Sequence, residues 1–154
     1  MGGQSGSEKV TLKTGRFGSF EVNKSAVMEL VGGIIGFPGF TKFVLLEYNP
    51  PFSWLHSAEH PELAFVVVSA SEFGDNYLFP LPIGDRDTGL KTEDEVAILN
   101  LVSVRPNPRE TTVNLKAPVI VNLTNMKGKQ LVLDDPRLSV RFPLFESDDS
   151  EGKV

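Results

Sequence analysis

Short apolar runs divided by glycine and proline limit what this chain can fold into. The sequence has 14 glycines and 11 prolines, and most of them stand between runs rich in valine, leucine, isoleucine and phenylalanine. Both residues interrupt helices and favour the turns that join strands. The pattern therefore predicts an all-β chain, an antiparallel barrel-like or sandwich fold with a few short helical turns.

The apolar runs place the expected strands. They cover residues 9–13, 17–22, 26–31, 43–48, 52–56, 63–69, 77–81, 96–104, 111–115, 119–123, 130–133 and 138–142. Runs 63–69 and 96–104 are apolar on both faces, which predicts fully buried strands. Gly15 predicts a hairpin between the first two strands, and residues 124–129 predict another. Thr92 to Glu95 has the form of a capping box, but the β-branched run after it permits at most a turn or two of helix.

Length and charge set the domain organisation. The 154 residues suit about one domain, which we expect over 9–145, with a flexible lead at 1–8 and an acidic, disordered tail at 146–154. The net charge of −5 argues against a protein that wraps nucleic acid or binds anionic lipid. No apolar run approaches a membrane span. Cysteine is absent, which excludes disulfides and thiolate sites and fits a reducing cytosol.

The motifs that could carry chemistry are weak. His56 and His60 stand four residues apart, but Pro61 follows at once and the order of residues differs from a zincin helix, so we expect two surface histidines and no metal. The run from Asp85 to Gly89 fails the calcium-loop pattern and predicts a turn. Adjacent carboxylates predict surface and turn positions, because neighbours on a strand point to opposite faces. This inventory favours a binding protein over an enzyme.

Charge is unevenly distributed along the chain. Residues 72–95 are acidic, whereas residues 105–141 are basic. Solvated surface explains this pattern, and a polar protein-binding surface is the alternative. The basic residues that could argue for RNA binding are Lys116, Lys127, Lys129, Arg137 and Arg141. We expect them to meet protein or solvent.

Several sequence blocks resemble one family, the flagellar assembly factor FliW. They include residues 36–46, 51–57, 59–67, 112–122 and 127–130, and the opening residues 14–18 look similar too. The blocks occur in the family's order over roughly residues 10–145. The motif positions that we expect to be structural are Gly36, Phe37, Pro38, Gly39, Phe40, Trp54, Asn114, Pro118 and Gly128.

The resemblance implies a barrel-like cytoplasmic protein that is not an enzyme and needs no cofactor. Such proteins bind the translational regulator CsrA and relieve its repression of target messages, flagellin mRNA among them. They also bind flagellin, so that flagellin and CsrA compete in a partner-switching mechanism. The resemblance further implies no direct contact with nucleic acid, no membrane, and a monomer when free.

Residues 73–90 are the expected partner surface. Tyr77, Leu78, Phe79 and Leu90 are apolar, lie between proline and glycine breakers, and sit outside the longest apolar strands. The alternative is that these side chains simply cap the barrel. Two other functions also remain open: a small-ligand-binding β-barrel or degenerate enzyme with a pocket near Trp54 and His56, and a purely structural assembly subunit.

Overall fold

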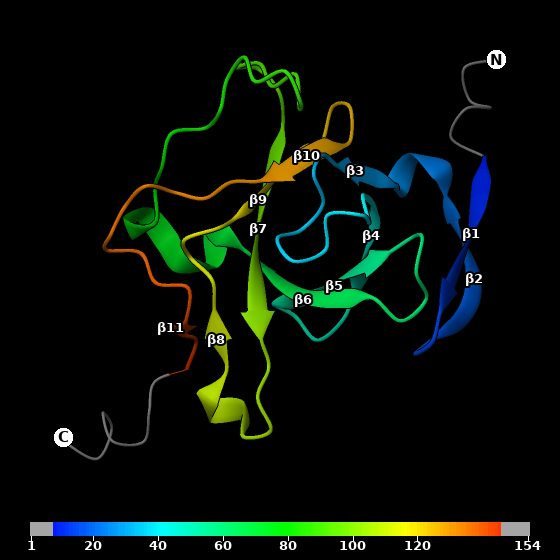
Figure 1. Ribbon diagram of the computed structural model, residues 1–154, viewed down its shortest axis with the longest axis horizontal. Helices are drawn as coiled ribbons and strands as arrows, with labels where there is room; N and C mark the ends of the chain where they lie inside the picture. Colours follow the sequence, from blue (N-terminus) through cyan, green and yellow to red (C-terminus); the bar gives the residue numbers. More distant parts are fainter. Residues whose placement is uncertain (1–7, 146–154) are drawn as a thin grey trace.

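A closed β-barrel forms the centre of the computed structural model, which describes residues 8–145 (Figure 1). Its strands run in the order β7-β6-β5-β4-β3-β10-β9, and β9 pairs with β7 to close the ring. Their bounds are β3 Met28–Leu30, β4 Lys42–Glu47, β5 Phe52–Ser57, β6 Ala64–Ser69, β7 Val96–Ser103, β9 Val119–Asn122 and β10 Lys127–Gln130. The predicted all-β, barrel-like fold is confirmed.

One pairing in the barrel is parallel. β3 and β10 run side by side in the same direction, with Glu29 opposite Lys127 and Leu30 opposite Gly128. All the other pairings are antiparallel, because most connections are hairpins between consecutive strands. The parallel pair joins the early part of the chain to the late part.

Two smaller units lie on opposite sides of the barrel (Figure 1). On one side, β1 (Lys9–Thr14) and β2 (Gly18–Asn23) form a separate two-stranded sheet. On the other side, β8 (Thr112–Val113) and β11 (Phe142–Pro143) extend the edge of β7. Short 3-10 helices complete the fold: η2 Lys24–Ala26, η3 Ala70–Asn76 and η4 Pro108–Glu110.

The predicted hairpin around Gly15 is confirmed. The Thr14 hydroxyl donates to the Gly18 carbonyl at 2.7 Å and accepts the Phe17 N–H at 2.7 Å, which closes the turn. Of the predicted lead and tail, only Glu8 is described; residues 1–7 and 146–154 lie outside the described residues. No helix within residues 8–145 is long and apolar enough to cross a membrane.

Two groups of buried side chains form the core. The barrel interior holds Met28, Leu30, Ile34, Phe43, Leu55, Val67, Leu99, Val119 and Val121. The second group lies under η3 and contains Val68, Tyr77, Val113 and Leu115. Val67 and Val68 therefore face different groups, as neighbours on a strand must. This is why the run is apolar on both faces.

The expectation that strands 63–69 and 96–104 are buried along their whole length was wrong, because only the middle or end of each strand is fully buried. Within β6 only Val67 and Val68 are fully buried, and within β7 only Leu99 and Asn100 are. The strands continue past the parts that η3 and the barrel interior cover. Their ends are therefore half-exposed.

One expected strand is absent from the described chain and two are displaced. Residues 77–81 form no strand. The strand expected at 130–133 is β10, which begins earlier at Lys127, and of 138–142 only Phe142 is paired, in β11. The turn before β10 uses Met126, which has φ of 60°. Residues 92–95 form a turn and no helix; the Asp94 carboxylate accepts the Lys91 N–H at 2.8 Å and the Asn122 amide at 3.1 Å.

The Gly-Phe-Pro-Gly-Phe motif forms a folded loop beside the barrel. Gly36 has φ of 95°, which favours glycine, whereas Gly39 has open space around it. The Phe37 ring is 5.4 Å from the Phe65 ring, edge to face, although Phe37 remains 40% exposed. Phe40 is partly buried against the barrel interior, with its ring 5.6 Å from the His60 ring. The motif thus has contacts of a packing role, and exposed Pro38 completes its turn.

The remaining motif residues also make structural contacts. The Asn114 side-chain oxygen accepts the N–H groups of Lys116 and Ala117 at 2.9 and 3.0 Å, which fixes the bend before β9. Pro118 is buried, and its carbonyl accepts the Leu131 N–H at 2.8 Å. Gly128 is buried where β10 lies against β9.

Candidate functional site

A groove lies where η3 meets the segment that leads to β11. Both segments lie on the side of the barrel opposite β1 and β2 (Figure 1). The groove has a volume of about 410 Å³. Its lining comes from Phe73, Asn76, Tyr77, Leu78, Leu115, Asp135, Arg137, Leu138, Ser139 and Phe142. We call it the η3 groove.

Tyr77 forms the floor of the η3 groove and ties it to the barrel. Its side chain is 7% exposed. Its hydroxyl donates to the Leu115 carbonyl at 2.6 Å and accepts the Asn100 amide at 2.9 Å. Burial raises the pKa of Tyr77, and the Asn100 hydrogen bond opposes that shift. Tyr77 therefore packs against the barrel as well as lining the groove.

The rim of the η3 groove carries exposed apolar side chains. Leu78 is 79% exposed and Phe142 is 42% exposed. Phe73 lies between Tyr77 and Phe142, with ring centres 5.9 and 6.3 Å away. Leu78 is the one residue of the predicted partner set that is well exposed to solvent.

One end of the η3 groove is charged. The Arg137 guanidinium donates to both Asp135 carboxylate oxygens, at 3.1 and 3.0 Å. This pairing lowers the pKa of Asp135 and raises that of Arg137. Because its lining combines apolar side chains with polar and charged ones, the groove fits a partner segment that is itself amphipathic.

Phe79 and Leu90 do not line the η3 groove. Phe79 is partly buried, and its ring is 5.4 Å from the Tyr77 ring. Leu90 is 1% exposed, and its carbonyl accepts the Gly84 N–H at 2.8 Å, which closes the loop between them. Partner contact stays a prediction for Tyr77, Leu78, Phe79 and Leu90, and of these four only Tyr77 and Leu78 line the η3 groove.

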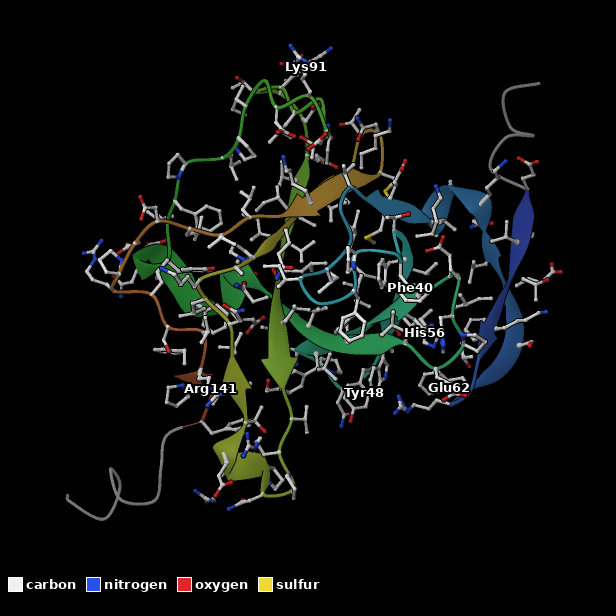
Figure 2. The ribbon with its side chains drawn as sticks, viewed as in Figure 1. Phe40, Tyr48, His56, Glu62, Lys91 and Arg141 are labelled. Atoms are coloured by element: carbon white, nitrogen blue, oxygen red, sulfur yellow. The ribbon has the colours of Figure 1, made fainter. Side chains whose placement is uncertain are left out.

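The pocket expected near Trp54 and His56 is small and polar. It has a volume of about 240 Å³ and is lined by Gly15, Arg16, His56, Pro61, Glu62 and Ala64. Figure 2 shows His56 and Glu62 at the end of the barrel nearest the β1–β2 hairpin. The prediction that His56 lies on the surface was wrong: His56 is 2% exposed, in the buried second half of β5. Its Nδ1 is 2.8 Å from the Ser57 carbonyl oxygen.

His60 and Trp54 each have other contacts. His60 Nδ1 accepts the Glu62 N–H at 3.1 Å. The Arg16 guanidinium lies 4.3 Å from the centre of the Trp54 ring, and the Tyr48 ring lies 4.9 Å away. Within residues 8–145 no three histidine, aspartate or glutamate side chains gather where they could hold a metal.

Sequence reasoning missed half of the η3 groove. Arg137 was expected only as part of a basic cluster, and Leu138 and Phe142 only as strand residues. The sequence signal was an apolar residue at every second position, Leu138, Val140 and Phe142. Val140 and Phe142 are indeed exposed.

Comparisons of the sequence and of the structure with known proteins point to the same family. A family profile described as "FliW protein" matches residues 11–144. The flagellar assembly factor FliW of Caldicellulosiruptor saccharolyticus is 35% identical over 144 residues, which cover 91% of this chain and 93% of that protein. The FliW of Bdellovibrio bacteriovorus is 36% identical over 137 residues, covering 87% and 78%. A crystal structure of the flagellar assembly factor FliW superposes with a TM-score of 0.79 at 27% identity, covering 90% of this chain and 99% of that one.

Proposed function

Since this chain belongs to the FliW family of flagellar assembly factors, we propose that it is a cytoplasmic binding protein that holds CsrA and flagellin in turn. Bound to CsrA, it relieves the repression of target messages such as flagellin mRNA. Free flagellin displaces CsrA and so limits its own translation. The protein acts by contact with these partners, as a non-catalytic monomer without cofactor, direct RNA contact or membrane attachment.

The η3 groove is the observation that carries this proposal. It combines a fixed apolar floor at Tyr77 with exposed apolar side chains at Leu78 and Phe142. An exposed leucine beside an ordered aromatic floor is typical of a surface that a partner covers. The Asp135–Arg137 pair at the end of the groove can orient a charged partner segment.

The shifted titratable groups support a binding role over catalysis. The groups whose pKa moves are Tyr77, Asp85, Asp94, Lys129, Asp135 and Arg137. Burial explains the shift of Tyr77, and hydrogen bonds within the fold explain the others. Their shifts therefore report how the fold is held together.

The first experiment mixes the purified chain with purified CsrA and separates the products by size-exclusion chromatography. A stable complex that forms without any small molecule, and that releases CsrA when flagellin is added, is the expected result. Absence of a complex with either protein would contradict the proposal. A complex that needs a small molecule would favour the ligand-binding barrel.

The second experiment tests the groove itself. Leu78→Asp should weaken binding of at least one partner about tenfold or more, since a charge that the partner covers without pairing it is costly. Ile35→Asp is the matched control, because Ile35 is 63% exposed and does not line the groove. If both variants bind the partners as tightly as the wild type does, the partner site does not lie in the η3 groove.

A further inference from the structure

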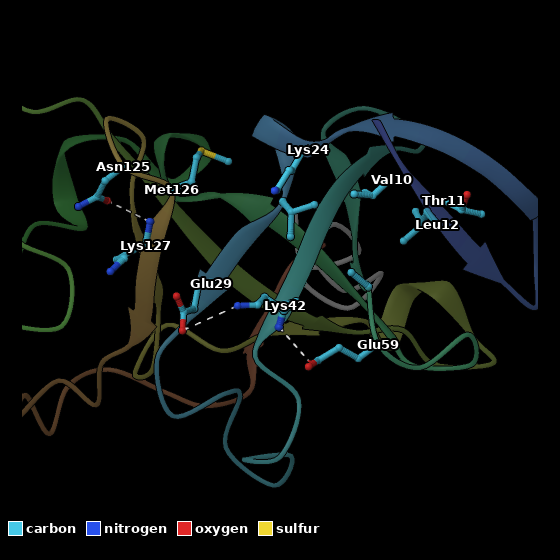
Figure 3. A pocket seen from close by; sticks show the side chains of 12 residues that line it. Val10, Thr11, Leu12, Lys24, Glu29, Lys42, Glu59, Asn125, Met126 and Lys127 are labelled. Atoms are coloured by element: carbon cyan, nitrogen blue, oxygen red, sulfur yellow. Dashed lines mark hydrogen bonds and ion pairs between the residues drawn. The ribbon is translucent and has the colours of Figure 1, made fainter. Parts of the chain in front are cut away.

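A second cavity lies on the other side of the molecule, between the β1–β2 hairpin and the barrel (Figure 3). It has a volume of about 410 Å³. Its apolar lining consists of Val10, Leu12, Val27, Ala58 and Met126. Lys24, Lys42 and Lys127 stand around it together with Glu29 and Glu59. We call it the hairpin cavity.

The hairpin cavity follows the edge of β1. Val10, Thr11 and Leu12 are consecutive, and all three line it. Consecutive side chains on a strand point to opposite faces, so three in a row can line one cavity only along the strand's edge. The backbone of β1 is therefore within reach of whatever occupies the cavity.

That edge of β1 is unpaired in the described part of the chain. β1 belongs to a two-stranded sheet and pairs only with β2. The Lys24 N–H donates to the Glu8 carbonyl at 2.9 Å, which makes these two residues a hydrogen-bonded pair. Bonding alternates along an antiparallel ladder, so the N–H groups of Lys9, Thr11 and Lys13 point away from β2.

Gly15 confirms that the N–H groups of this series point away from β2. It is the next residue in the alternating series, and its N–H donates to the Pro61 carbonyl at 2.8 Å. The outward side of the chain just after β1 thus already donates one backbone hydrogen bond, to the turn between β5 and β6. Thr11 and Lys13 have no such partner among the backbone hydrogen bonds of residues 8–145.

The lysines around the cavity are available to a new partner. The Lys127 ammonium has no ion pair with any described residue. Lys24 is 3.8 Å from Glu8 and Lys42 is 4.0 Å from Glu29, and exposed pairs at such distances contribute little. One oxygen of Glu59 is already engaged by the backbone, since Oε1 accepts the N–H groups of Thr41 and Lys42 at 2.8 and 3.2 Å.

We propose that β1 takes up an extended, acidic segment of another protein as a third strand. The segment's backbone bonds to the outward groups of Thr11 and Lys13, one apolar side chain enters the hairpin cavity, and its carboxylates meet Lys24, Lys42 and Lys127. A second copy of this chain is disfavoured as the occupant. Two β1 edges would bring Lys9 and Lys13 of one copy close to those of the other, and lysine on an edge strand opposes self-pairing.

The test uses a fluorescein-labelled peptide of alternating valine and glutamate, followed by fluorescence anisotropy at low salt. The full chain should bind it saturably, and the same peptide with glutamine in place of glutamate should bind about tenfold more weakly. Joint replacement of Lys24, Lys42 and Lys127 by glutamine should cause a similar loss. Equal binding of both peptides would overturn the proposal.

Thr11→Pro tests the strand addition itself. Proline removes the outward N–H and leaves the bonds to β2 intact, so binding should fall at least tenfold, whereas Thr11→Val should bind like the wild type. Undiminished binding by a folded Thr11→Pro variant would refute strand addition. If circular dichroism shows that this variant is unfolded, amide hydrogen exchange in the wild-type chain tests strand addition instead. Exchange at the Thr11 and Lys13 N–H groups must then slow when the peptide binds.

Other occupants give different results. Slow exchange at Thr11 that appears without peptide and rises with protein concentration would identify a second copy. Slow exchange that vanishes when residues 146–154 are deleted would identify the chain's own acidic terminus. Either result overturns binding of a separate partner. Leu78→Asp should leave peptide binding unchanged, so this test and the test of the η3 groove fail independently.

Discussion

Because Gly128 has no side chain, β10 can lie close against β9. A Cβ placed on Gly128 would collide with the Ile120 carbonyl and come within 3.0 Å of the Leu30 side chain. Its backbone also opposes Leu30 in the parallel pair that joins β3 to β10. Glycine at this position is a packing requirement of the barrel.

Gly128→Ala should therefore destabilise the protein by about 1–3 kcal/mol, the usual cost of overpacking a core. Gly39→Ala is the control, because nothing lies within 4 Å of the position that its Cβ would take and its φ is not positive; it should change stability by less than about 0.5 kcal/mol. Urea denaturation followed by circular dichroism measures both. Equal midpoints for the two variants would show that β10 can shift to make room.

Tyr77 offers a second test at the residue scale. Tyr77→Phe keeps the ring but leaves the Leu115 carbonyl and one Asn100 N–H without their partner. The expected cost is about 1–3 kcal/mol, because an unsatisfied buried polar group loses its hydration. Tyr48→Phe should be nearly neutral, since Tyr48 is 49% exposed. A neutral Tyr77→Phe would mean that water replaces the hydroxyl.

The same hydroxyl predicts a dependence on pH. Burial raises the pKa of Tyr77 above its usual value of 10.0, so folding favours the neutral phenol. This contribution is complete below pH 10 and disappears as pH rises through the folded-state pKa. The wild type should therefore lose stability more steeply above pH 10 than Tyr77→Phe does, as measured by thermal melts across that range. Parallel curves would argue that Tyr77 does not titrate with unfolding.

Among the elements, the loop between η3 and β7 is held by one lysine of β10. Lys129 Nζ is 2.8 Å from an Asp85 oxygen and 2.9 Å from an Asp87 oxygen. The Lys129 hydrogen bond is the main reason that the pKa of Asp85 is lowered. A lowered carboxylate pKa stabilises the fold above the usual value of 3.8, and the effect is lost as pH falls through the folded-state pKa.

Lys129→Met should raise the pKa of Asp85, reduce this acid-dependent part of stability, and lower stability at neutral pH by about 1 kcal/mol. Carboxyl chemical shifts during a pH titration report the first effect, and urea midpoints report the others. Lys127→Met, which removes a lysine without an ion pair on the described surface, serves as control. An unmoved Asp85 pKa would leave the Thr88 hydrogen bonds as its main cause.

The elements differ in how well the sequence predicts them. β4, β5, β6, β7 and β9 were predicted within a residue or two, because each is rich in apolar residues and lies between breakers. β10 was displaced, because two of its four residues are lysine and its glycine resembles a turn. The η3 groove was predicted only on its η3 side, since contacts between residues 73–78 and 135–142 depend on tertiary packing that periodicity does not encode.

At the scale of the whole molecule, charge argues for protein partners. The basic residues that could attract RNA are largely engaged: Lys129 with Asp85 and Asp87, Arg137 with Asp135, and Lys116 with the Asp135 carbonyl. A net charge of −5 adds repulsion toward phosphate.

We accordingly expect the chain alone not to bind flagellin leader RNA. Fluorescence anisotropy with labelled RNA at low salt should stay flat, and a signal should appear only when CsrA is added. An arginine-rich RNA-binding peptide provides the positive control. Binding by the chain alone that weakens steeply with salt would contradict this expectation.

The closure of the barrel has a consequence for biosynthesis. β3 is made early but finds its neighbour β10 only after residues 127–130 have been synthesised, and β7 must wait for β9. Until then a nascent chain on the ribosome carries an open sheet whose end strands lack partners. A protein proposed to adjust the translation of another message thus gains its own partner surfaces only near the end of its own translation, when the ring can close.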